Sequence, residues 1–204
     1  ATSLGDLTDD VDFNASGSVA LDALNGTLVA KGDFTIKIGQ LQSYDLPSGK
    51  AADANAVAFQ LQDATVWAGI GGRLGAGADP DDHSDDTVDN GTLGFHASVD
   101  TLTVVAIKDV GDELVPTDDT NYLGVAADTF TADLIGLESV LEFHVWNADL
   151  LLNKATDTDP LTLEDPDKLD WSGFSNTGLD IEDELNALGQ TSLGDLTADV
   201  DLEA

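Results

Sequence analysis

Apolar side chains recur at every second position along much of the chain, and this spacing strongly limits the folds it can adopt. In residues 11–21, Val11, Phe13 and Ala15 alternate with polar neighbours. The same alternation recurs in six further segments, 34–38, 57–61, 95–99, 102–106, 130–134 and 141–145. Because successive side chains of a β-strand point to opposite faces, the spacing predicts strands with one buried face. The predicted fold class is all-β.

The segments between the predicted strands contain short turn signals. Asn25-Gly26 favours a two-residue hairpin turn, and 31–33 and 135–137, each with a central Gly, are also predicted to turn tightly. Short connections join antiparallel neighbours. We therefore expect an antiparallel meander that forms a sandwich or a β-solenoid-like unit continuing into the next repeat. Helical spacing occurs at 179–188, before Gly189, and predicts a short helix or turn.

The two ends of the chain carry nearly the same sequence. Residues 2–15 and 191–204 are identical at 11 of 14 positions. This indicates one period of a longer array of repeats, and the alternative is a duplicated terminal hairpin within one globule. The predicted organisation is a junction strand at 1–15, a β-rich repeat body at 11–174, a junction segment at 175–190 and the start of the next copy at 191–204.

The composition excludes several classes of partner. The chain has 40 acidic and 7 basic residues and a formal net charge of −33. Nucleic-acid backbones and anionic lipids are bound through Lys and Arg, so we predict no nucleic-acid partner and no attraction to anionic membranes. The sequence contains no run of 18 apolar residues, so we expect no direct membrane insertion. The absence of Cys excludes disulfides and thiolate sites, and the absence of Met indicates a fragment or a processed chain.

Three clusters of acidic residues are candidate calcium sites, because calcium prefers clustered oxygen ligands. They lie at 79–90, at 157–167 and at the start of the repeat, and their candidate metal ligands are Asp79, Asp81, Asp82, Asp85, Asp86, Asp89, Asp157, Asp159, Asp165, Asp167, Asp6, Asp10 and Asp12. The first cluster is not an EF-hand, since Ser84 stands where Gly is needed and Asn90 where a bidentate Glu is needed. The alternative is an acidic, halophilic surface that keeps the protein soluble in high salt.

Aromatic residues and histidines give fewer functional signals. Trp67 and Trp146 share the polar parity of their segments and are candidates for stacking on a glycan, with core or inter-repeat packing as the alternative. His83, His96 and His144 lack metal-site spacing and are predicted to be surface or pairing residues. No nucleophile or phosphate-binding motif occurs, and the 40 acidic residues make a chance carboxylate pair inevitable. We predict that the chain is not an enzyme.

Four segments carry a resemblance to a known family. They are 11–21, the LIGLESVL segment at 134–141, the LNKATD segment at 152–157 and Leu169-Asp-Trp171. These segments resemble the repeat modules of very large repetitive bacterial extracellular and surface proteins, which are adhesin-like and calcium-associated. The resemblance implies a structural spacer at the cell surface or outside the cell, and it brings no catalytic residues.

The predicted function follows from the repeat and this resemblance. We expect a structural repeat unit of a long secreted surface protein or extracellular filament, stabilised by cations, with calcium as the candidate ion. Its partners would be identical neighbouring repeats or subunits in a linear or helical assembly. The alternative is a glycan-binding module of a surface adhesin, which would bind surface glycans.

Overall fold

The computed structural model of the chain describes residues 11–41, 54–79, 81–109, 119–157, 166–171 and 202–203. Within these ranges the regular structure is almost entirely antiparallel β, as predicted, and it contains no α-helix. The expected helix or turn at 179–188 lies outside the described residues. No helix in the described ranges is long and apolar enough to cross a membrane.

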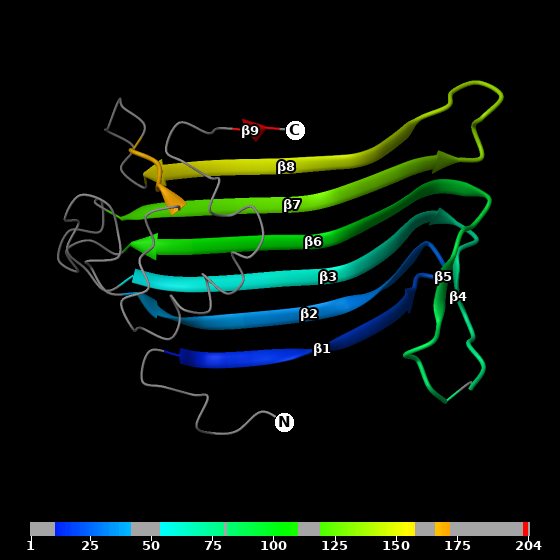
Figure 1. The fold of residues 1–204 in the computed structure, drawn as a ribbon, viewed down its shortest axis with the longest axis horizontal. Helices are drawn as coiled ribbons and strands as arrows, with labels where there is room; N and C mark the ends of the chain where they lie inside the picture. The colour runs from blue at the N-terminus through cyan, green and yellow to red at the C-terminus, as the bar shows by residue number, and fades with distance from the viewer. Residues whose placement is uncertain are drawn as a thin grey trace.

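One large meander dominates the structure (Figure 1). Its seven strands, in spatial order, are β1 (Val11–Ala23), β2 (Leu28–Leu41), β3 (Ala54–Ile70), β6 (Leu93–Asp109), β7 (Thr120–Ile135), β8 (His144–Asp157) and β9 (Leu202–Glu203). Each is antiparallel to its neighbour. A second sheet contains only β4 (Arg73–Gly75) and β5 (Thr87–Asp89), a hairpin inserted between β3 and β6.

Several predicted element boundaries were wrong. The predicted strands at 95–99 and 102–106 form the single strand β6, and β7 and β8 extend well beyond the predicted segments. The loop at Asn25-Gly26 spans four residues, from Leu24 to Thr27, rather than two. The expected turn at 31–33 lies inside β2, where the absence of a side chain on Gly32 permits the close approach of Ala64.

A transverse crease explains why the alternation was interrupted within long strands. Asp63 of β3 and Thr129 of β7 have left-handed φ angles of 48° and 54°, and the register places both beside Asp100 of β6. Across this line, Lys31 and Asp33 of β2 pair with residues 65 and 62 of β3. Two residues therefore oppose three, which is a β-bulge, and the inward-facing parity shifts by one. The strands bend together toward the hairpin end of the sheet (Figure 1).

One face of the large sheet is covered, and the core lies there. We call it the covered face; it includes Ala56 and Ala58 of β3, Val105 and Ile107 of β6, and Tyr122 of β7. Leu169 and Trp171 pack on these residues and are 0 % and 6 % exposed. The small Ala side chains leave room for the indole ring against the strands. Burial of these apolar surfaces stabilises the unit by roughly 25 cal/mol per Å².

The opposite face is uncovered. We call it the open face; it includes Phe34, Ile36 and Ile38 of β2 and the residues registered with them across the sheet. The contrast is visible within β3, where Ala56 is 0 % exposed and its neighbour Val57 is 38 % exposed. A single strand thus has one face in the core and one apolar face toward solvent.

The β4–β5 hairpin packs over the covered side of β1 to β3, at the end beyond the crease (Figure 1). Lys31 of β2 anchors it, because its Nζ donates to the carbonyl oxygens of Ser84 and Asp86 at 2.7 Å each. Trp67 lies beneath the hairpin and is 0 % exposed. Gly72 lies directly against its indole ring, in a space that a Cβ could not share.

Candidate functional site: two sheet edges and an acidic hairpin

The two copies of the repeated sequence lie at opposite edges of the large sheet (Figure 1). Residues 13 and 14 belong to β1, which pairs with β2. Their copies, Leu202 and Glu203, form β9, which pairs with β8. The strand that begins the next copy therefore extends the sheet on the edge opposite to the one where this copy begins.

The direction of the two edge strands is the same. Six antiparallel steps separate β1 from β9, and an even number of reversals restores the original direction. A further unit added at β9 would therefore repeat the strand directions of this one. A unit with an odd number of strands would instead reverse direction at every junction.

The register of the two edges also preserves the face of the sheet. Phe13 pairs with Ile38 in β1–β2, and its copy, residue 202, pairs with Leu152 in β8–β9. Ile38 and Leu152 both belong to the open face, but their registered rows differ by two residues along the strands. The second edge is thus staggered by two residues, or about 7 Å at 3.4 Å per residue. An even stagger keeps inward and outward positions unchanged.

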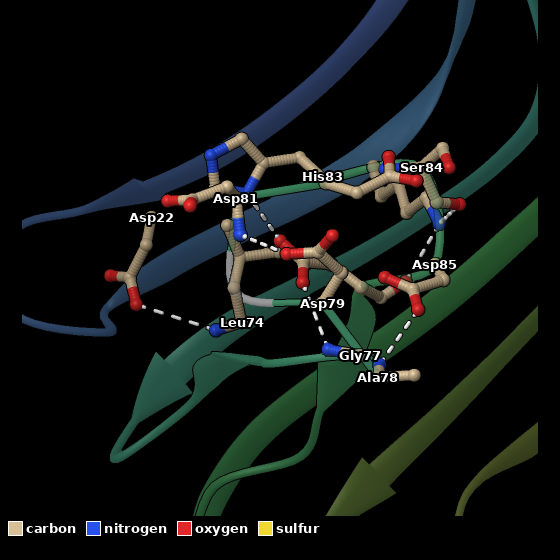
Figure 2. Close-up of polar contacts among 12 residues, drawn as sticks. Asp22, Leu74, Gly77, Ala78, Asp79, Asp81, His83, Ser84 and Asp85 are labelled. Carbon is tan, nitrogen blue, oxygen red and sulfur yellow. Dashed lines mark hydrogen bonds and ion pairs between the residues drawn. The ribbon is translucent and has the colours of Figure 1, made fainter.

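The acidic hairpin is the other candidate site, and its carboxylates bond to its own backbone (Figure 2). Asp79 Oδ1 accepts from the amide of Asp81 at 3.1 Å, and Asp82 Oδ1 accepts from that of Ser84 at 2.9 Å. Asp85 Oδ2 accepts from the amide of Ala78 at 2.7 Å. Such Asp-to-backbone bonds stabilise turns and explain why this loop is rich in Asp.

Two cationic side chains pair with carboxylates at the base of the hairpin. The Arg73 guanidinium donates to Asp89 Oδ2 at 2.9 Å and, together with the Thr87 hydroxyl, lowers the pKa of Asp89. The His83 ring and the Gly77 amide lower the pKa of Asp86, which is 6 % exposed. The side chain and amide of Ser84 likewise lower the pKa of Asp82. These three carboxylates therefore keep their negative charge to lower pH than an ordinary Asp.

The predicted metal ligands are distributed over separate places. Asp79 and its acidic neighbours up to Asp89 share the hairpin, whereas Asp12, Asp157 and Asp167 lie on β1, at the end of β8 and in the segment 166–171. Asp6, Asp10, Asp159 and Asp165 lie outside the described residues. Within the described ranges, no three His, Asp or Glu side chains form a group that could hold one metal ion.

The two glycan candidates differ in exposure. Trp67 is 0 % exposed beneath the hairpin, so its ring offers no face to a sugar, and the glycan assignment fails there because the crease turns this residue inward. Trp146 on β8 is 71 % exposed. Any stacking role among these two residues therefore falls on Trp146.

The predicted pairing of histidines with carboxylates is present at two sites. His144 Nδ1 lies 2.6 Å from Asp133 Oδ1 across β7 and β8, and this bond raises the pKa of His144, with smaller contributions from Glu142 and Glu138. His83 pairs with Asp86 in the hairpin at 2.8 Å. Both histidines are accessible surface residues that hold neighbouring segments together.

Two segments noted in the sequence for their resemblance to surface repeats meet in the structure. Asn153 Nδ2 donates to the Leu169 carbonyl oxygen at 2.8 Å, and Trp171 Nε1 donates to Asn153 Oδ1 at 3.1 Å. Asn153 is 1 % exposed, so both bonds are shielded from water. Asn153 thus fixes the segment that covers the core. Sequence reasoning gave it no role, because the spacing between Asn153 and Trp171 follows no known motif.

Fold and edges together define a class of protein, a single antiparallel β-meander whose repeated sequence marks both of its edges. Comparison with protein-family models, curated proteins and solved structures finds no match for the chain.

Proposed function

We propose that this chain is a structural repeat unit that joins identical neighbours edge to edge in one continuous sheet. The observation that carries the proposal is the pairing of β9 with β8, since β9 is the copy of residues 13 and 14 in β1. The shared strand direction and the preserved face give further support, because every added unit would meet the same junction geometry.

The proposed assembly has definite dimensions. Six strands separate equivalent positions, so each unit advances the array by about 29 Å at 4.8 Å per strand. The two-residue stagger adds about 7 Å along the strands at each junction. The result is a ribbon with the strands across its width, in which backbone hydrogen bonds carry the load from one unit to the next. The resemblance to surface repeats suggests an extracellular setting for such a spacer.

Cations are part of this proposal. Each unit adds a formal charge of −33, and an edge-to-edge array brings these charges together every 29 Å or so. Sodium would screen the repulsion, and calcium bridging carboxylates of neighbouring units would both neutralise and stiffen the junction. The two roles differ in ion specificity.

A tandem chain of two units tests the edge pairing. We would join two units at the natural period of 189 residues and measure hydrogen exchange of the β8 amides in the first unit. We expect the amides of β8 that point away from β7 to become protected in the tandem chain, because a complete β1 of the second unit pairs with them. Unchanged exchange in the tandem chain would contradict the proposal.

A matched control separates pairing from mere tethering. Leu202→Pro in the tandem chain removes a backbone donor from the joining strand, which a paired strand does not tolerate. The equivalent change at Thr27, in the exposed β1–β2 loop, alters no inter-unit bond. We expect L202P to abolish the added protection at β8 and T27P to retain it.

A further inference from the structure

The open face contains no acidic residue at any of its alternating positions, although the chain contains 40. The large apolar residues of this face in the three central strands are Val57, Phe59, Leu61, Val66, Ile70, Leu93, Phe95, Val99, Leu102, Val104, Leu123, Val125, Phe130 and Leu134. Its charged residues are Lys108 and Lys154, near one end. Acidic residues of the described strands lie instead on the covered face, at the crease or at the β1 bulge, as with Asp33, Asp63 and Asp12.

This face also holds nearly all of the exposed large hydrophobic residues of the strands. They are Phe13, Val19, Leu21, Leu28, Val57, Ile70, Leu93 and Phe95, and the exception is Trp146. A hollow of about 440 Å³ lies on the same face at the crease, lined by small and apolar residues such as Ala64, Ala97 and Phe130. Asp149 also lines it and accepts a bond from the Thr129 amide. Soluble proteins seldom leave a continuous apolar surface of this extent in water.

The area of the open face is sufficient for a stable interface. Strands of 13 to 17 residues are about 45 to 55 Å long, and six of them are about 29 Å wide. The face therefore measures roughly 1,400 Å², against about 800 Å² per partner in a typical stable complex. In an edge-joined array, the faces of successive units would form one uninterrupted apolar stripe.

We propose that the open face packs against the open face of a second copy of this chain, forming a two-layered sheet. The distribution of charge favours this occupant. Two chains of −33 repel one another in most orientations, but contact through these acid-free faces directs the acidic hairpins and covered faces outward into solvent. The small residues around the crease hollow leave space for side chains of the opposing sheet. The interface is independent of the edge pairing, since it involves the face and not the edges of the sheet.

Sedimentation of the chain at low and at molar NaCl tests this proposal. We expect a dimer that strengthens with salt, because salt screens the repulsion between the two acidic chains. Val57→Asp should weaken the dimer at least about tenfold, since a carboxylate would be buried without a partner. Val140→Asp is the control, because Val140 is 86 % exposed in the β7–β8 connection. Both variants should keep the wild-type circular dichroism spectrum.

A second measurement does not depend on a disruptive substitution. The chain contains no Cys, so Val104→Cys, near the centre of the open face, can carry the single nitroxide label. Face-to-face sheets lie about 10 Å apart, whereas equivalent residues in edge-joined units lie about 29 Å apart. We expect a distance clearly shorter than the edge-joined value. A monomer at all salt concentrations, an edge-joined distance, or binding to phosphatidylcholine vesicles without self-association would overturn the proposal.

Discussion

At the scale of the residue, hydrogen bonding decides what the acidic side chains can do. Asp79, Asp82 and Asp85 each accept a backbone amide of their own loop, so their carboxylates shape the hairpin. Composition identified this segment correctly as the densest acidic cluster. It could not tell carboxylates that bind amides from carboxylates directed at an ion, because both uses favour Asp in a turn.

The pair of His144 and Asp133 leads to a pH prediction. The carboxylate of Asp133 raises the pKa of His144 in the folded chain, so the pair stabilises the fold fully below the unfolded value of about 6.5. That stabilisation is lost as the pH rises through the folded pKa. We expect Asp133→Asn to lower the pKa of His144, measured by NMR titration of its ring, and to remove this loss from the urea midpoint.

Glu142→Gln provides the matched control for this titration. Glu142 raises the pKa of His144 less than Asp133 does, since it acts by charge alone and makes no hydrogen bond to the ring. We therefore expect a smaller decrease in the pKa with E142Q than with D133N. Equal titration curves for the wild-type chain and D133N would show that the pair does not form in solution.

At the scale of the element, alternation predicted the strands but not their lengths or the crease. Residues 95–99 and 102–106 follow opposite parities in the sequence, which indicated two strands, because a shift of parity normally marks a break. The structure keeps one strand and absorbs the shift at Asp100. The same shift turned Trp67 inward. Neighbouring strands bend at the same level, and that information is not local to any one strand.

Backbone strain at the crease can be tested at Thr129. This β-branched residue has a φ of 54°, a conformation that costs L-residues about 1–3 kcal/mol. Glycine adopts it without that cost and retains the amide that donates to Asp149. We expect Thr129→Gly to raise the free energy of unfolding by about 1 kcal/mol in urea denaturation, after its greater unfolded-state entropy is included.

Thr101→Gly is the control for the crease. Thr101 lies in β6, one residue from the crease, and does not have a positive φ. Glycine there loses strand entropy without relieving strain, so we expect the free energy of unfolding to fall by about 0.5–1 kcal/mol. Destabilisation by both variants would show that the left-handed conformation at Thr129 carries no strain.

At the scale of the whole molecule, the charge and the sheet oppose each other. Strand pairing draws units together at the edges, while a charge of −33 on every unit drives them apart. The repeated ends could be read from the sequence alone. The acid-free open face could also have been noticed as a missing residue type on one parity, but the crease shifts that parity within β3, β6 and β7 and hides the pattern.

The balance between these forces predicts how salt acts on one unit and on two. Electrostatic screening extends over about 30 Å at 0.01 M salt and about 3 Å at 1 M. Neighbouring units in the proposed array lie about 29 Å apart, so their repulsion acts at low salt and vanishes at high salt. We expect the melting temperature to rise with NaCl for a single unit, and to rise more steeply for the tandem chain.

Calcium added at fixed, high sodium then separates a specific site from screening. Screening by sodium is already complete under those conditions, so any further stabilisation by millimolar calcium must come from direct coordination. A shift confined to the tandem chain would locate the ion at the junction, where the repeat start brings Asp195, Asp199 and Asp201 of the copied sequence. Magnesium is the matched control, because it retains its water shell and rarely accepts clustered carboxylates as calcium does. Equal melting temperatures with and without calcium in both chains would remove calcium from the proposal and leave sodium screening as the stabilising effect.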